Sequence, residues 1–170
     1  VLGLFRACRE LEDPVIFVEH ILLYGTRGEA PDADYKIPLG QAAVARAGND
    51  VTIISYSRMA QVSLAAAEQL AGQGIDAEVV DLRTLRPLDM DTVVESVKKT
   101  HRALVVEETS KMGGFAGEVS SQIQEAAFDF LDTPVDVLGH MDPFDPEAAQ
   151  GHALVEKQRR EMGRSRHGEA

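Results

Sequence analysis

The sequence predicts an α/β fold: a three-layer, mostly parallel sheet with helices on both faces. Apolar, β-branched runs alternate along the chain with segments rich in helix-forming residues, the pattern of strands that are followed by helices. The clearest unit spans residues 51–89, where a strand, a helix and a second strand follow one another through short connections. Such a unit is parallel, and its crossover is right-handed.

The elements of this unit follow from local chemistry. Residues 51–56 are apolar and largely β-branched, which predicts a buried strand. Ser57 is a suitable N-cap for a helix over residues 59–73, which are rich in Ala, Leu, Glu and Gln. Residues 77–82 predict the second strand.

The chain before this unit predicts less regular structure. Residues 1–11 are compatible with a short helix, and residues 15–18 predict a short buried strand. Residues 19–36 contain glycines, a proline and acidic residues, and predict a long surface loop of the kind that serves as a linker. Residues 42–46 predict an edge strand.

The chain after this unit continues the alternation. Asp89 is a good N-cap for the next predicted helix, whose last residues Lys98 and Lys99 complement the helix dipole. The further elements expected are a helix over 90–99, strands over 103–106 and 134–138, and helices over 115–130 and 147–162.

Composition and charge exclude several classes of protein. The net charge of −11 argues against nucleic-acid binding and favours partners with basic surfaces. Residues 151–170 carry a net charge of +2, so the first 150 residues carry −13. No run approaches 18 apolar residues, so no membrane-spanning helix is expected. The single Cys8 fits a reducing compartment. Because the sequence opens on Val without a signal pattern, we expect it to come from a longer polypeptide.

Residues that could carry chemistry are scattered. The five histidines have no metal-ligand spacing, and His20, beside Glu19 at the end of a predicted strand, is the one of interest. Glu107 and Glu108 close the strand predicted over residues 103–106, at the edge where open α/β sheets bind ligands. Adjacent strand residues point to opposite faces, so we expect solvation and local pairing of these two rather than joint catalysis.

Two other segments near the same edge have structural explanations. Residues 113–117 open a helix with three glycines, which favours a tight turn and close backbone approach over phosphate binding. Arg83 and Arg86 could clamp an anion, but pairing with acidic neighbours is the expected arrangement. The residues alone therefore predict an α/β domain without a self-sufficient active site.

A set of motifs in fixed order resembles the C-terminal half of the β subunit of pyruvate dehydrogenase E1. Single pieces also resemble branched-chain 2-oxoacid and acetoin dehydrogenases, transketolase and deoxyxylulose-phosphate synthase. The order and the last motif are most similar to the pyruvate enzyme. The sequence departs from the family's usual pattern after Val137. The motifs are DPVIFVEHILLYG (13–25), YKIPLG (35–40), DVTI (50–53), AEVVDLRTLRPLD (77–89), VVEE (105–108) with GG (113–114), and FDFLDTP (128–134).

The resemblance implies a transketolase C-terminal fold in a thiamine-diphosphate enzyme. It implies that thiamine diphosphate and Mg²⁺ are bound mainly outside this chain. It also implies assembly with an E1 α-type subunit and a second β copy, and docking to the basic peripheral-binding domain of the E2 acyltransferase. Asp132 is the candidate for the E2 contact. The implied parts are a remnant of an upstream pyrimidine-binding domain (1–18), a linker (19–40), the C-terminal domain (41–150) and an atypical basic tail (151–170).

Other functions remain open from the sequence. The chain could be a β-subunit fragment of a branched-chain 2-oxoacid or acetoin dehydrogenase, a deoxyxylulose-phosphate synthase fragment, or a non-catalytic α/β association module. If the chain comes from an E1 β subunit, the resemblance implies its cellular location. It would lie in the cytoplasm of a bacterium, or in the mitochondrial matrix or plastid stroma of a eukaryote. Neither nucleic acid nor membrane is an expected partner.

Overall fold

The computed structural model describes residues 1–28, 31–32 and 34–140. The predicted helix over 147–162 and the basic tail therefore lie outside the described residues. The elements, in chain order, are α1 (Leu2–Cys8), the 3-10 helix η1 (Ile21–Leu23), β1 (Ala43–Arg46), β2 (Val51–Ser55), α2 (Arg58–Ala71), β3 (Ala77–Asp81), α3 (Met90–Thr100), β4 (Ala103–Ser110), α4 (Ala116–Ala127), the 3-10 helix η2 (Phe128–Phe130) and β5 (Asp136–His140).

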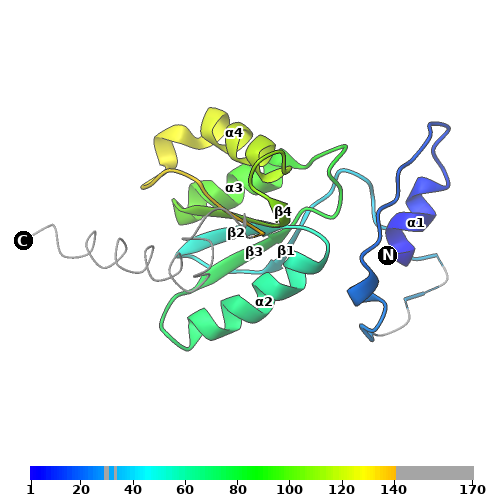
Figure 1. Ribbon diagram of the computed structural model, residues 1–170, viewed down its shortest axis with the longest axis horizontal. Helices are drawn as coiled ribbons and strands as arrows, with labels where there is room; N and C mark the ends of the chain where they lie inside the picture. Colours follow the sequence, from blue (N-terminus) through cyan, green and yellow to red (C-terminus); the bar gives the residue numbers. More distant parts are fainter. Residues whose placement is uncertain (29–30, 33, 141–170) are drawn as a thin grey trace, which may run out of the picture.

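The described strands form one five-stranded sheet in the order β1-β3-β2-β4-β5. All neighbouring strands are parallel except β1, which pairs antiparallel with β3 at one edge. Helix α2 covers one face, and α3 with α4 cover the other (Figure 1). The predicted three-layer α/β architecture and the parallel unit over residues 51–89 are confirmed.

Strand β2 lies at the centre of the sheet, and all five of its residues are buried. Ile54 belongs to the core under α3 and α4, whereas Ile53 belongs to the core under α2. Both faces of a parallel sheet are normally covered, which requires apolar residues on both sides of its strands. The β-branched run that predicts this strand therefore also predicts its central position.

The side chain of Asp89 forms hydrogen bonds both to the residue before β1 and to the first turn of α3. Its carboxylate accepts a hydrogen bond from the backbone N–H of Thr92 (3.1 Å), which caps α3 as predicted, and another from the backbone N–H of Ala42 (2.9 Å). Burial alone pushes the pKa of Asp89 upward, but the hydrogen bonds from Thr92 and Ala42 outweigh it and leave the pKa below its ordinary value. The Asp89 side chain thus caps α3 and also holds in place the residue that precedes the edge strand β1.

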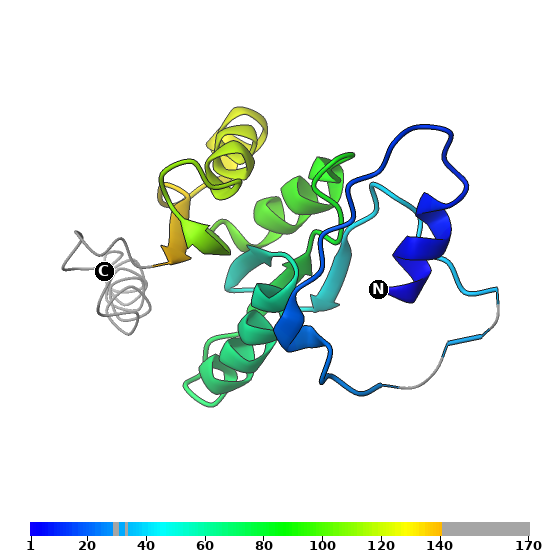
Figure 2. The same cartoon turned by 45° about the vertical axis from the view of Figure 1, so that its right-hand side comes forward.

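The predicted buried strand over residues 15–18 is wrong. The segment is irregular, with Ile16 92% and Val18 84% exposed, and residues 1–28 lie to one side of the sheet, apart from its strands (Figure 2). A strand needs a neighbour for its backbone N–H and C=O groups, and no described strand lies beside this segment. Its apolar run therefore forms exposed surface rather than core.

Two other boundaries differ from the expectations. Strand β4 continues to Ser110, four residues beyond the predicted end, because β5 pairs with it as far as His140 opposite Ser110. The predicted helix over 115–130 divides into α4 and η2, with the change of geometry at Ala127 and Phe128.

Two glycines provide a matched test of the packing. A Cβ at Gly48 would lie 2.3 Å from the carbonyl carbon of Ala77, whereas a Cβ at Gly117, inside α4, would meet no heavy atom within 4 Å. We expect Gly48→Ala to lower the free energy of unfolding by about 1–3 kcal/mol through overpacking. Gly117→Ala should raise it by about 0.5–1 kcal/mol because alanine favours a helix interior. Urea unfolding of both variants measures this, and shifts of the same sign would contradict the packing described.

Candidate functional site

The carboxyl ends of β2 and β4 are the natural place to look for a ligand site. The chain turns to opposite faces of the sheet after β2 and β3, so the strand order reverses between β2 and β4. Open α/β sheets bind ligands at such a switch point. Tyr56 follows β2 there, and Glu107 and Glu108 lie on β4.

Glu107 is enclosed at this edge and fastens the start of α4. The residue is only 2% exposed, and its Oε2 accepts hydrogen bonds from the backbone N–H of Ala116 (3.0 Å) and the hydroxyl of Tyr56 (3.2 Å). A carboxylate at a helix N-terminus is stabilised by the helix dipole. The expected solvation of Glu107 is therefore wrong, because the turn before α4 folds back over it.

The glycines of this turn allow that close approach. A Cβ at Gly114 would lie 1.9 Å from Oε1 of Glu107, and Gly113 has a positive φ of 79°. Oε1 has no hydrogen-bond partner among the described residues. The prediction that the glycines allow a tight turn and a close approach of the backbone is confirmed. The Glu107 carboxylate holds this turn and the start of α4 by hydrogen bonding.

Glu108 projects to the other side and holds the N-terminal segment. Its Oε2 lies 2.7 Å from Nε2 of His20. The backbone N–H of Leu22 donates to Nδ1 of His20 (3.2 Å), so the imidazole hydrogen that faces Glu108 is on Nε2. The expected local pairing is confirmed for Glu108. His20, the histidine of interest in the sequence, is thus a contact between η1 and the end of β4.

The two arginines near this edge differ in their surroundings. The backbone N–H of Arg83 donates to Oδ1 of Asp81 (3.0 Å). Burial raises the pKa of Asp81, while the hydrogen bond and the charge of Arg83 partly offset that rise. Arg86 has no ion pair with any described residue, so its expected acidic pairing is wrong. It lines an open groove of about 840 Å³ with Leu85, Pro87, Leu88, Phe115, Glu118 and Gln122.

The described residues include neither a cluster of metal ligands nor a helix that could span a membrane. Among them, no group of three His, Cys, Asp or Glu side chains could hold a metal ion. None of the helices in the described ranges is long and apolar enough to cross a membrane.

Asp132, the residue singled out by the resemblance, lies in the turn between η2 and β5. Its carboxylate is 49% exposed, and Oδ2 lies 2.9 Å from Nη2 of Arg102. Its backbone N–H donates to the carbonyl of His101 (2.9 Å). The turn is therefore fixed against the end of α3, with the carboxylate at the surface.

Two exposed phenylalanines lie in η2, shortly before Asp132 in the chain, and we call the set Phe128, Asp129, Phe130 and Asp132 the η2 surface. Phe128 is 70% and Phe130 44% exposed. The ammonium of Lys98 lies 5.0 Å from the centre of the Phe130 ring, a cation–π contact that orients the ring. Local sequence patterns did not predict that Phe128 is exposed, that Lys98 contacts Phe130 or that Arg102 pairs with Asp132; the paired phenylalanines of FDFLD were the available signal for an exposed aromatic patch.

Comparisons with known proteins agree with this α/β architecture. The transketolase C-terminal domain family matches residues 40–159. The chain is 44% identical over 140 residues to the β subunit of pyruvate dehydrogenase E1 from Cyanidium caldarium, covering 82% of this chain and 43% of the relative. It is 48% identical over 135 residues to the β subunit of acetoin:2,6-dichlorophenolindophenol oxidoreductase from Cupriavidus necator, covering 79% and 40%.

A solved structure of a split gene transketolase, described as an inactive beta4 tetramer, superposes with a TM-score of 0.56. It is 34% identical and covers 76% of this chain and 40% of that one. The fold is thus that of a transketolase-type α/β domain. The chain belongs to the transketolase C-terminal domain family, and it spans about two fifths of the length of the curated relatives it matches.

The contact between Tyr56 and Glu107 predicts an unusual titration. Burial, with the charge and hydrogen bond of Glu107, raises the pKa of Tyr56 to about 12. An acid whose pKa is higher in the folded state stabilises the fold below its unfolded pKa of about 10 and loses that contribution as pH rises through the folded value. We expect ultraviolet titration to show a tyrosine step near pH 12 that Tyr56→Phe removes. Retention of that step in Tyr56→Phe would contradict the assignment.

Proposed function

We propose that this chain is the C-terminal assembly and E2-docking part of a β subunit of a thiamine-diphosphate-dependent pyruvate dehydrogenase E1. The similarity to the Cyanidium caldarium and Porphyra purpurea β subunits over 82% of the chain supports this proposal. In the full enzyme, pyruvate is decarboxylated and the acetyl group passes to the lipoyl group of E2. This chain contributes surfaces to that assembly, and the fragment alone is inactive.

The observation that carries the docking proposal is the η2 surface. Exposed aromatic side chains are typical anchors of protein interfaces, and Phe128 and Phe130 lie within five residues of chain that also include Asp129 and Asp132. The aromatic rings offer apolar contact area, and the carboxylates of Asp129 and Asp132 offer acceptors for basic side chains of the E2 peripheral-binding domain. The charge of −13 on the first 150 residues would also speed the encounter with such a partner.

Arg102 orients Asp132 for this contact. The Arg102 guanidinium is mostly buried, with 18% of its side chain exposed, whereas the Asp132 side chain is 49% exposed. Because one partner is held by the body and the other faces outward, the carboxylate is fixed in position before E2 arrives. Fixing a side chain in advance lowers the entropy cost of binding.

The exposed apolar residues of the N-terminal segment support the assembly part of the proposal. Ile16, Val18 and Ile21 are each more than 70% exposed, and His20 holds this segment against β4. Exposed apolar patches of this kind mark interaction sites. We assign this surface to contacts with the upstream domain of the β subunit, the α-type subunit and a second β copy.

The donor set of the described residues does not fit the cofactor. Thiamine diphosphate in this enzyme class requires Mg²⁺, which takes oxygen ligands in octahedral geometry. No group of potential ligands among the described residues could hold a metal ion. We therefore assign the cofactor and its metal mainly to other polypeptide segments and derive no catalytic step from this chain.

An acetoin dehydrogenase β subunit is the second candidate, favoured by the 48% identity to the Cupriavidus necator protein. The two candidates share the fold and the assembly role and differ in the substrate of the complete enzyme. Steady-state assays of the complete enzyme with pyruvate and with acetoin distinguish them.

The docking proposal predicts the effect of one charge reversal. Asp132→Lys places a cation against the basic E2 domain, so the dissociation constant should rise by at least about tenfold, which corresponds to roughly 1.4 kcal/mol. Glu68→Lys makes the same charge change at an exposed position of α2, on the opposite face of the sheet, and should leave affinity within about twofold. Isothermal titration calorimetry with an E2 peripheral-binding domain measures both, and equal affinities would remove Asp132 from the site.

A further inference from the structure

We propose that Lys98 is a positioning residue of the η2 surface: its ammonium holds the Phe130 ring in the orientation that the E2 peripheral-binding domain contacts. The proposal rests on the docking function proposed above and deepens it. Lys98 is exposed in the last turn of α3, and its ammonium is 5.0 Å from the centre of the Phe130 ring. A cation at a surface that binds a basic partner needs an explanation, because like charges weaken such contacts.

The backbone of η2 is already fastened to the end of α3 through His101. This residue is the C-cap of α3 and has a left-handed backbone conformation with φ 61°. Its Nδ1 donates to the carbonyl oxygen of Phe130 (2.8 Å), and its own carbonyl oxygen accepts from the backbone N–H of Asp132 (2.9 Å). These hydrogen bonds hold the chain on either side of Leu131, but they do not act on the Phe130 ring.

The direction of the Phe130 ring therefore depends on side-chain contacts. Phe130 is 44% exposed and belongs to neither hydrophobic core of the described residues. An exposed ring outside the core has several staggered rotamers open to it. The ammonium of Lys98 favours the rotamer in which the face of the ring meets the cation.

The neighbouring Lys99 shows what a structural lysine at this helix end does. Its ammonium pairs with the carboxylate of Glu78, which is 1% exposed. Lys98, in contrast, has no ion pair with any described residue. Both lysines complement the dipole of α3, but the charge of Lys98 is also free to act on the ring.

Lys98 has two effects on docking, and they have opposite signs. Its charge repels a basic partner, so on that ground alone its removal would strengthen binding. A ring held in advance spares the entropy cost of fixing an interface side chain, and an exposed cation–π contact changes an equilibrium constant by about two- to fivefold. Salt screens exposed charges, so at physiological ionic strength the second effect is the larger.

The sign of the change in affinity tests the proposal in the full chain. Isothermal titration calorimetry with an E2 peripheral-binding domain should show that Lys98→Gln raises the dissociation constant by about two- to fivefold. Lys98→Arg keeps a cation above the ring and should bind as tightly as the unchanged chain. Lys111→Gln makes the same charge change at an exposed residue before α4, whereas η2 follows α4, and should not raise the dissociation constant.

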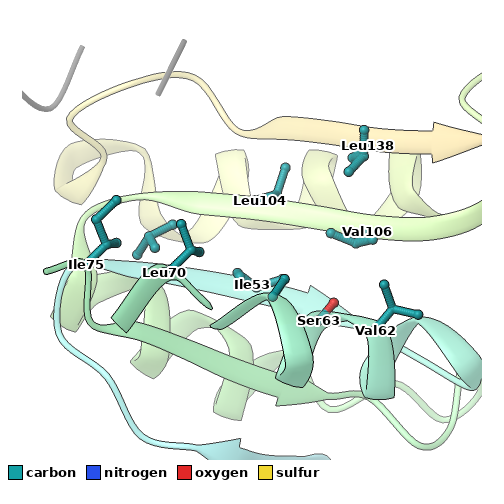
Figure 3. A pocket seen from close by; sticks show the side chains of 10 residues that line it. Ile53, Val62, Ser63, Leu70, Ile75, Leu104, Val106 and Leu138 are labelled. Atoms are coloured by element: carbon teal, nitrogen blue, oxygen red, sulfur yellow. The ribbon is translucent and has the colours of Figure 1, made fainter. Parts of the chain in front are cut away.

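A second background shows whether Lys98 acts through the ring. In Phe130→Leu, which lacks the ring, Lys98→Gln should cause no further rise in the dissociation constant, because the two residues are coupled. Val62→Ala is the control for loss of exposed apolar surface, since Val62 is 43% exposed. It lines an apolar pocket of about 100 Å³ beside α2, on the opposite face of the sheet (Figure 3), and its replacement should leave the affinity within about twofold.

The other outcomes are equally specific. A dissociation constant that falls or stays unchanged in Lys98→Gln would overturn the proposal. An equal rise in the Phe130→Leu background would also overturn it and would indicate a role of Lys98 in the helix alone. If Asp132→Lys weakens binding while Lys98→Gln does not, this proposal fails and the docking function stands. If none of these variants changes the affinity, or the unchanged chain does not bind the E2 domain, the docking function fails and this proposal fails with it.

Discussion

The complete burial of β2 is the constraint on which the rest of the structure depends. A central parallel strand with apolar residues on both faces requires a covering layer on each side. Helices α3 and α4 provide one layer and α2 the other, which sends consecutive crossovers to opposite faces and creates the switch point between β2 and β4.

The edge where such folds usually bind ligands is occupied here by structural contacts. Glu107 braces the start of α4, and Glu108 holds His20 of the N-terminal segment. What this chain presents outward is contact surface: exposed apolar residues around Ile16 and the aromatic, acidic η2 surface. Exposed apolar and aromatic surfaces of this kind are typical of protein–protein contact sites, as the proposed function requires.

Sequence reasoning predicted the elements whose signals are local. The strand at β2 and the cap at Asp89 follow from β-branched runs and capping chemistry, and the structure places them within a residue or two. It failed for residues 15–18, because an apolar run indicates burial without showing whether the covering partner is in the same chain. It also missed the Arg102–Asp132 pair, which depends on how α3 and η2 pack rather than on any local pattern.

We propose that the cofactor chemistry belongs to polypeptide segments outside these residues. Calorimetric titration of the chain with thiamine diphosphate and Mg²⁺ tests it most directly, with a complete E1 heterotetramer as the positive control. We expect no measurable binding to the chain alone under conditions in which the heterotetramer binds. A low-micromolar dissociation constant for the isolated chain, roughly −8 kcal/mol of binding free energy, would contradict it.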